Sequence, residues 1–569
     1  MTNKPVVLGP WAKGINNKSR AHELPKDSVR DALNYDFTDY GYVRSREGYS
    51  QTDAVDNGHS LSAQGSRVFL CNDGSLSVVI SVNPLVTQVV RSGLSLDPIS
   101  YAELGDEVWW SNGTDSGRCE AGNVDAPWSV PTPDDIPLAI AGVGTMLPGA
   151  YRVAISHTMA NGEESATSEI YNLSVPVAGS IIVTLPIAKS GTDFFRVYCS
   201  TADGSVLKRY GDVSAASGSM TITADPQGMS LQDGAFLAPL PPGNIVAFHN
   251  GRLLSASGNE LYYSQPYNFG LCDLNSGWLR VTGEITIVAP CEGGVFIVAD
   301  KTWFYAGNDI AESVVTEVLP FGAVRGTTFY HPDTKAVGWF SAQGFVIGQP
   351  DGSVALPQRD NGFSVPIAQT GATWVRERNG ETHLVCSLDG TAAYGKDVSP
   401  DFTTARMRYD DDATTVSMNL ANGASSRYNN WHFTGFAKFD GSEYGLDDVG
   451  LSLLEGSADD VTPIQTVLDV GKIGLQSLQI KTPDVVYVSS KSQDRLIVTI
   501  ALENGDTYDY PARDYSEDNV RVHRHDGMKG LMNRRQTRFD VAIRNDPDVG
   551  GRSEIADVSV IVHHSARKI

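Results

Sequence analysis

The chain has 569 residues, of which 41% are hydrophobic and 9% aromatic, so it can bury packed cores and is not a disordered chain. This length exceeds what one hydrophobic core supports, and it predicts two to four domains. The 56 Gly and 28 Pro, together with the absence of a long helical pattern, favour an all-β protein with many turns.

The net charge of −23 is unevenly distributed along the chain. Residues 1–50 carry 8 basic and 6 acidic side chains and residues 521–569 carry 10 and 6, so the two ends sum to +6 and the remainder to −29. An acidic body gains no affinity for DNA from counterion release. Two interpretations stay open: a wall that DNA passes without sticking, and an acidic surface that only aids solubility.

The six cysteines show neither CxxC nor zinc-site spacing, so we expect reduced and mostly buried thiols. The N-terminus lacks the apolar segment of a signal peptide, and no run approaches 18 apolar residues. We therefore expect a protein that is soluble and intracellular when made, without membrane insertion.

Residues 241–269 carry the clearest pattern. Asn250-Gly251 accepts the positive φ angles of a two-residue hairpin turn between two short apolar runs. Gly258-Asn259 repeats this device before the strand 261–264, which predicts a meander of three short strands.

The same pattern recurs upstream in residues 61–111 and downstream in residues 286–305 and 337–354. Units of this spacing predict a β-propeller-like platform or a large sandwich. No Trp-Asp signature repeats, so the sequence leaves the number of blades open. Trp109 and Trp110 lie on opposite faces of one predicted strand, where buried packing is the simple interpretation and sugar stacking the alternative.

Residues 123–137 form a Pro-rich linker. The alternating runs 149–156, 181–185 and 195–198 follow it, with turn signals between them, and roughly seven strands in this length are typical of a small β-sandwich.

In the C-terminal half, residues 401–430 are polar and include Asp410-Asp411-Asp412, so we expect a loop. The aspartates lack the alternating ligand pattern of a calcium loop. Further on, Asn504-Gly505 predicts another antiparallel hairpin.

The expected domains are an N-terminal arm with the first propeller strands (1–122), an inserted immunoglobulin- or fibronectin-like sandwich (123–240), a propeller core (241–435) and a C-terminal β-rich closing region (436–569).

No motif supports catalysis. There is no GxSxG elbow and no glycine-rich phosphate loop. The acid pairs Asp447-Asp448 and Glu163-Glu164 are adjacent in sequence, so in a strand they face opposite ways and are poorly placed to flank one glycosidic bond. His523 and His525 share a strand face and could form half of a metal site, but no further ligand is evident. We expect no enzyme activity, no cofactor and no metal.

Four stretches resemble structural tail proteins of bacteriophages. The segment HNGRLLSASGNELYYSQPYNF, which ends at Phe269, looks like the propeller core of tail-tube and nozzle proteins. Gly14-Ile15-Asn16-Asn17, Leu24-Pro25, Asn34 and the arginines before Gly48 resemble their N-terminal signature, which implies a strand contributed to a sheet far away in sequence. Residues 529–562 are similar to their closing β-sandwich, and the segment 123–240 resembles the sandwich insertions common in such proteins, although it lacks the Cys…Trp…Cys framework.

The resemblance implies a structural virion protein made in the host cytoplasm and placed in the tail. It would form the nozzle of the tail as a hexameric ring, a conduit through which genomic double-stranded DNA leaves without sequence-specific binding. Its partners would be a tail adaptor and fibre or receptor-binding proteins. We expect the basic C-terminal residues Arg534, Arg535 and Arg538 to face an acidic neighbouring surface.

Two alternatives remain from other classes of protein. In the first, the chain is a receptor- or glycan-binding adhesin whose exposed Trp and Tyr stack on sugar rings. In the second, it is a polysaccharide depolymerase.

Overall fold

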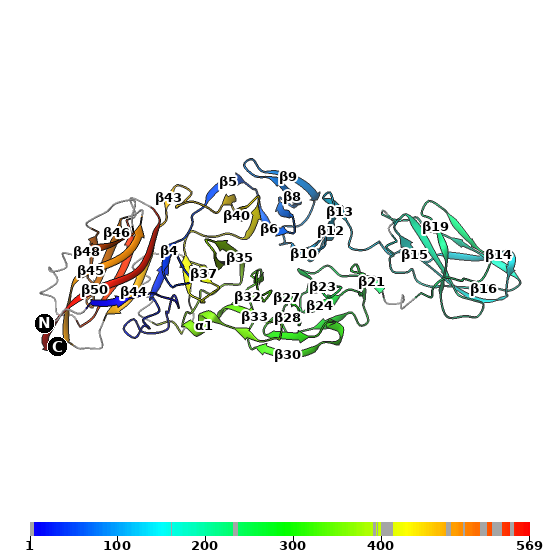
Figure 1. Ribbon diagram of the computed structural model, residues 1–569. Helices are drawn as coiled ribbons and strands as arrows, with labels where there is room; N and C mark the ends of the chain where they lie inside the picture. The colour runs from blue at the N-terminus through cyan, green and yellow to red at the C-terminus, as the bar shows by residue number, and fades with distance from the viewer. Residues whose placement is uncertain are drawn as a thin grey trace. The chain divides into compact units, whose positions relative to one another are not determined.

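The structure is a computed structural model in which nearly all regular structure is β-strand (Figure 1). It describes residues 5–568 except 161, 190, 232–236, 391–393, 395, 396, 400–412, 474–478, 493, 494, 513–519, 526–536 and 547–550. The chain divides into two compact units. Unit 1 comprises Met1–Leu96, Phe296–Phe304 and Thr316–Ile569, and unit 2 comprises Asp97–Val295 and Tyr305–Val315.

Unit 2 contains two four-stranded antiparallel sheets whose strands follow chain order. The first is β10 (Ser100–Leu104), β11 (Glu107–Ser111), β12 (Ser116–Glu120) and β13 (Val124–Ala126); the second is β22 (Ile245–His249), β23 (Arg252–Ser257), β24 (Glu260–Tyr263) and β26 (Trp278–Arg280). The β22–β23 turn is the predicted hairpin, because Asn250 and Gly251 have φ angles of 42° and 79°. Trp109 and Trp110 are both buried, as packing predicts.

A third sheet of this kind follows along the chain. It consists of β27 (Ile287–Cys291), β28 (Gly294–Val298), β29 (Thr302–Ala306) and β30 (Val314–Leu319), with the short 3₁₀ helix η1 (Ile310–Glu312) before β30. In unit 2 a two-stranded sheet pairs β21 (Leu237–Pro239) with β25 (Leu271–Asp273).

Unit 1 repeats the four-stranded form. The sheet of β31 (Phe329–Tyr330), β32 (Val337–Ser341), β33 (Gly344–Gly348) and β34 (Val354–Ala355) precedes helix α1 (Pro357–Asn361), and the next sheet begins β35 (Thr370–Arg378), β36 (Glu381–Asp389), β37 (Thr415–Asn419), β38 (Ser425–Tyr428). The predicted loop over 401–430 is wrong from Thr415 onward, since β37 and β38 are buried strands; residues 401–412 lie outside the described part. These strands look like a loop because their polar residues hydrogen-bond to the N-terminal arm instead of packing on apolar side chains.

Within unit 1, strands from residues 50–91 and from residues 435–453 form one eight-stranded sheet. Its strands are, in order, β5 (Ser50–Ala54), β41 (Gly450–Leu453), β40 (Ser442–Leu446), β39 (Gly435–Phe439), β6 (His59–Gln64), β7 (Arg67–Asn72), β8 (Ser75–Ser81) and β9 (Val86–Arg91). Strand β5 pairs with β41, which comes nearly 400 residues later, at one edge of this sheet. In the middle of the sheet, β39 pairs with β6 in parallel. The expected boundary between residues 435 and 436 therefore lies inside the platform, at β39. In the described residues, four antiparallel four-stranded sheets whose strands follow chain order recur beside the larger sheets, and the fold is all-β with a β-propeller-like platform, as predicted.

The inserted domain is a β-sandwich of two antiparallel sheets. One sheet has the order β14 (Leu138–Met146), β17 (Gly179–Thr184), β20 (Ser219–Ile222), and the other β16 (Tyr171–Val175), β15 (Gly149–Thr158), β18 (Phe194–Cys199), β19 (Lys208–Ser214). The inner faces enclose a core that includes Tyr151, Ile181 and Phe195. Its seven strands and its packing agree with the predicted immunoglobulin- or fibronectin-like insertion.

The C-terminal region of unit 1 is a second sandwich. One sheet continues from β38 through β2 (Asp31–Leu33) to β44 (Val467–Ile473), β49 (Phe539–Asn545), β46 (Leu496–Leu502) and β47 (Thr507–Pro511); the other has the order β3 (Tyr35–Phe37), β4 (Val43–Ser45), β50 (Ser553–Lys568), β45 (Gln479–Ser492), β48 (Val520–His525), with β1 (Pro5–Leu8) on β50. A small hairpin, β42 (Ala458–Asp459) with β43 (Thr462–Pro463), precedes β44. The hairpin predicted at Asn504-Gly505 joins β46 to β47, and Gly505 has a φ of 90°.

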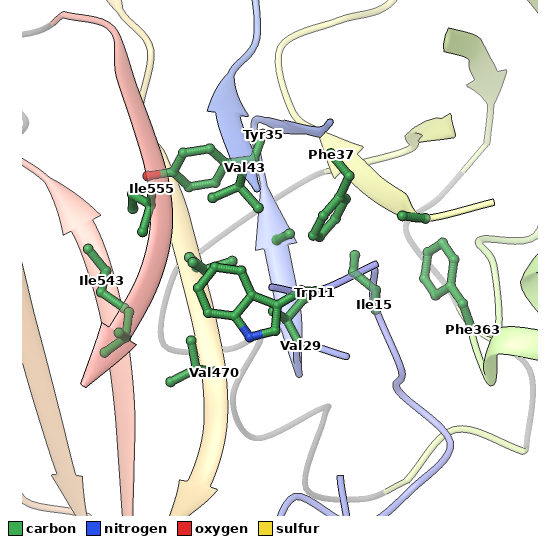
Figure 2. Packing of buried hydrophobic residues seen from close by; sticks show 14 of the residues in the cluster. Trp11, Ile15, Val29, Tyr35, Phe37, Val43, Phe363, Val470, Ile543 and Ile555 are labelled. Carbon is green, nitrogen blue, oxygen red and sulfur yellow. The ribbon is translucent and has the colours of Figure 1, made fainter. Parts of the chain in front are cut away.

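The largest core cluster is built where the N-terminal residues enter this region. Trp11, Ile15 and Val29 belong to the same cluster as Val470 of β44 and Ile555 of β50 (Figure 2). Segments from the two ends of the chain therefore share one core, and neither end forms a separate domain.

Candidate functional site

The N-terminal arm, residues 5–47, is held by strands that lie far away in the sequence. Its strand β2 lies between β38 and β44, with Leu33 opposite both Arg427 and Val467. Strand β4 pairs with β50 through Val43 and Ile555. The expectation that the arm contributes strands to a sheet far away in sequence is met.

The run Gly14-Ile15-Asn16-Asn17 fixes the entry of the arm. Gly14 has a φ of 68°, and a Cβ at this position would collide with the backbone of Ser425, so only glycine fits. The Ile15 N–H donates to the Ser425 carbonyl at 3.0 Å. The Asn17 side chain imitates a strand partner: its Nδ2 donates to the Ser364 carbonyl and its Oδ1 accepts from the Ser364 N–H, both at 2.7 Å.

Asn34 and Arg46 form the second contact of the arm. Asn34 has a φ of 57°, and its Oδ1 accepts a hydrogen bond from Arg46 Nε at 2.9 Å. Arg46 is 0% exposed, and its Nη1 and Nη2 donate to the two carboxylate oxygens of Asp459 at 2.8 and 2.7 Å. Its guanidinium carbon lies 4.9 Å from the ring centroid of Trp431. The arginine is thus neutralised, hydrogen-bonded and stacked, as burial of a guanidinium requires.

A second buried ion pair joins β2 to β38. Arg427 donates from Nε to Asp31 Oδ1 at 2.7 Å and from Nη2 to Asp31 Oδ2 at 2.5 Å. Both side chains are almost completely buried. Because removal of either partner would leave a buried charge, this pair ties the arm to the platform sheet.

Asp36 of β3 is the centre of a third polar group. Its carboxylate accepts hydrogen bonds from Arg376, from Tyr428 and, at 3.0 Å, from Ser417 Oγ. Burial would raise the pKa of Asp36, but the positive charge of Arg376 and the other donors outweigh it and lower the pKa to about 2. The same contact raises the pKa of Arg376, so both groups stay charged.

These contacts connect the arm with strands from 300 to 500 residues further along the chain. Each charged group named above has an internal partner, and Gly14 and Asn34 sit at backbone positions with positive φ angles. The arrangement can hold distant segments together. Sequence reasoning missed Arg427, because it predicts a loop over residues 401–430, and it missed Asp459, because the partner of Asp459, Arg46, lies 413 residues earlier in the chain.

The predicted interaction residues are only partly described. Arg534 and Arg535 lie outside the described residues. Arg538 is half-buried just before β49, beside Lys481, whose pKa is lowered by burial and further by the charge of Arg538. Lys481 Nζ donates to the Thr537 carbonyl at 2.9 Å.

The adjacent acids Glu163 and Glu164 bind different partners. Glu163 is held by Arg118 at 2.9 and 3.0 Å, whereas Glu164 accepts from Tyr198 and Arg196, both at 2.6 Å. The side chains of His523 and His525 lie outside the described part. Within the described residues there is no group of three or more His, Cys, Asp or Glu that could hold a metal ion.

No protein-family model matches the chain, and no curated protein matches it. Among solved structures it is similar to the computationally designed Ika8 protein, with 11% identity over 72% of this chain and 100% of that chain at a TM-score of 0.31. It is also similar to the Neurospora crassa Pan2 WD40 domain (9% identity, 59% of this chain, 86% of that chain, TM-score 0.24) and to the WD40 β-propeller domain of Doa1 (11%, 60%, 91%, 0.22). At such TM-scores these likenesses carry no argument about function. No helix in the described part of the chain is long and apolar enough to span a membrane.

Proposed function

We propose that the chain is a structural virion protein that forms the nozzle of a phage tail, a conduit for DNA ejection and a docking platform for fibres. One observation carries the proposal. The residues that resemble the tail-protein signature, from Gly14 to Arg46, are engaged in internal backbone and ion-pair contacts that hold the arm in place. This is how a signature behaves when it preserves an architecture and not a reaction centre.

The charge distribution is consistent with this function. A conduit must let DNA slide. Residues 51–520 carry a net charge of −29, and such an acidic chain does not attract the phosphate backbone. Trp109 and Trp110, the residues considered for sugar stacking, are buried, so they give the adhesin alternative no support.

The proposal is tested by the particle mass and rotational symmetry of the purified protein, from light scattering and averaged electron images. We expect six-fold rings with an axial hole, in the presence of the tail adaptor if the chain alone stays monomeric. Three-fold particles that bind or degrade a host polysaccharide would instead identify an adhesin or a depolymerase.

The placement of the C-terminal arginines has its own test. Arg534→Glu combined with Arg535→Glu is expected to prevent assembly, because the heterologous interface of a ring would then bring acidic surfaces together. Assembly that is unchanged by this double substitution would show that these residues do not lie at the interface.

A further inference from the structure

The linker of residues 127–137 leads from β13 into the inserted sandwich and makes contacts on both sides. Trp128 is buried in a core cluster of unit 2, and its Nε1 donates to the Gly117 carbonyl at 2.8 Å. Three residues later, the Pro131 carbonyl accepts a hydrogen bond from Nδ1 of His157, a residue of β15, at 2.6 Å. An imidazole therefore ties the backbone of the linker to the sandwich.

This imidazole is deeply buried. His157 is 1% exposed, and the centroid of its ring lies 4.9 Å from that of Phe195 in the sandwich core. A carbonyl oxygen can only accept, so Nδ1 carries the hydrogen, and in the neutral ring Nε2 is an acceptor. Nε2 is buried and has no hydrogen-bond partner among the described residues. The ring thus donates one hydrogen bond, and the described residues offer no acceptor for a second.

Charged groups face His157 from two elements. Lys189 lies in the segment between β17 and β18, Asp134 lies in the linker, and the two form an ion pair at 2.6 Å. Burial lowers the pKa of His157, whereas the hydrogen bond to Pro131 raises it. The charge of Lys189 lowers this pKa further and that of Asp134 raises it, and the balance is a pKa below the usual 6.5.

The other acids near the end of β15 have partners of their own. Glu164 accepts hydrogen bonds from Arg196 and Tyr198, both at 2.6 Å, and Asp193 accepts one from the Ala160 N–H at 2.7 Å. These two carboxylates are therefore committed to other donors and are not counter-ions for a protonated imidazole.

We propose that His157 is a pH-sensitive latch that fastens the linker to the inserted sandwich at neutral pH and releases it in mild acid. Protonation places a hydrogen on Nε2 and a positive charge on a buried ring, and neither gains a partner there. Water solvates both once the segment around Pro131 moves away from the ring. The fastened form therefore binds protons more weakly than the released form, so acid favours release.

The pH range follows from the direction of the shift. In the released form the ring has its ordinary pKa of 6.5, so the latch is fully stable above that pH and weakens as the pH falls below it. Trp128 is held by the other contact of the linker, so release frees only the side that touches the sandwich. The latch concerns contacts within the chain and does not rest on the proposed function.

The test uses the full-length chain with Thr132→Cys, which places a thiol where the buried Oγ1 of Thr132 lies, next to Pro131. The rate of its reaction with 4,4′-dithiodipyridine is corrected with the unsubstituted chain for the native cysteines. A free peptide of residues 127–138 that carries the same cysteine corrects for the pH dependence of the thiol chemistry. The corrected rate is expected to be at least about threefold higher at about pH 5 than at about pH 7.5.

Two substitutions in this background separate the hydrogen bond from the proton. His157→Asn keeps a donor near the position of Nδ1 but cannot titrate, so the thiol should stay protected at both pH values. His157→Phe removes the donor, so the thiol should react rapidly at both. His249→Asn is the matched control and should leave the pH dependence unchanged, because His249 is also buried and also has a lowered pKa, but lies in β22.

The two charges that face the ring give a readout that a purely structural contact would not move. Lys189→Gln and Asp134→Asn remove the same ion pair. Loss of the lysine charge raises the pKa of His157 and should move release to higher pH, whereas loss of the aspartate charge should move it to lower pH.

A corrected rate that does not depend on pH would overturn the proposal. So would a rise in acid that persists in His157→Asn, because acid would then act through another group. Shifts of the two charge variants in the same direction would also contradict it. The symmetry of the assembled particle has no influence on this thiol reaction, so the latch and the proposed function fail separately.

Discussion

The N-terminal arm and strand β14 are both extended segments at the margins of sheets, but they differ in which side chains they bury. In the arm, the charges of Asp31, Asp36 and Arg46 are buried against internal partners. In β14 there are no charges, and the apolar side chains remain exposed. The difference teaches that a polar sequence can form the interior of a protein, while an apolar one can remain at its surface.

The largest effect is expected from breaking the arm at its fully buried arginine. Arg46→Ala leaves Asp459 buried without a counter-charge, and it should lower the free energy of unfolding by about 3–5 kcal/mol. Urea denaturation followed by circular dichroism measures this loss in the free energy of unfolding. Arg280→Ala, which removes a solvent-exposed pair with Glu260, is the control and should leave the urea midpoint nearly unchanged. Equal effects of the two substitutions would mean that Arg46 does not hold the arm.

The entry of the arm should be nearly as sensitive. Gly14→Ala combines a left-handed backbone with a collision against Ser425 and should cost about 2–4 kcal/mol. Gly441→Ala has a similar positive φ of 84° but open space around the added Cβ, so it isolates the backbone cost of about 1 kcal/mol. If the two variants unfold at the same urea concentration, the close approach at Gly14 is relieved by movement of the arm.

Acid should loosen the arm through Asp36. Its pKa is about 2 in the folded protein and close to 3.8 when unfolded, so its contribution is complete above about pH 5 and disappears as the pH falls toward 2. Over this pH range the free energy of unfolding of the unchanged protein should fall by about 2 kcal/mol more than that of the Asp36→Asn variant. Urea midpoints measured at a series of pH values give the two slopes. Parallel slopes would show that Asp36 has no depressed pKa.

The smallest effect concerns the contact between β12 and the loop after β15. Arg118→Lys keeps the charge but loses the two-point contact with Glu163, which is partly exposed, and should cost about 1 kcal/mol. In a double-mutant cycle, Glu163→Gln should add little to it. Full additivity of the two substitutions would show that the pair does not interact in solution.

The sequence predicted those parts of the fold that depend on local chemistry. Asn250-Gly251 and Asn504-Gly505 specify hairpins through their own backbone preferences, and the alternating runs of the sandwich specify its strands. Non-local pairing could not be read in this way. Strand β38 is polar because Arg427 meets Asp31, almost 400 residues earlier, and β39 belongs to the platform because β5 and β6 join its sheet. The arm signature indicated a distant partner without identifying it.

Hydrogen–deuterium exchange of the full-length protein compares the two regions in one measurement. The account predicts that amides of the arm between Gly14 and Arg46 exchange as slowly as those of the core strands, since the arm is held by buried ion pairs. It also predicts that about half of the amides of β14 exchange rapidly, because one edge of the strand is open. Rapid exchange of the arm, or full protection of β14 in the isolated protein, would contradict the account.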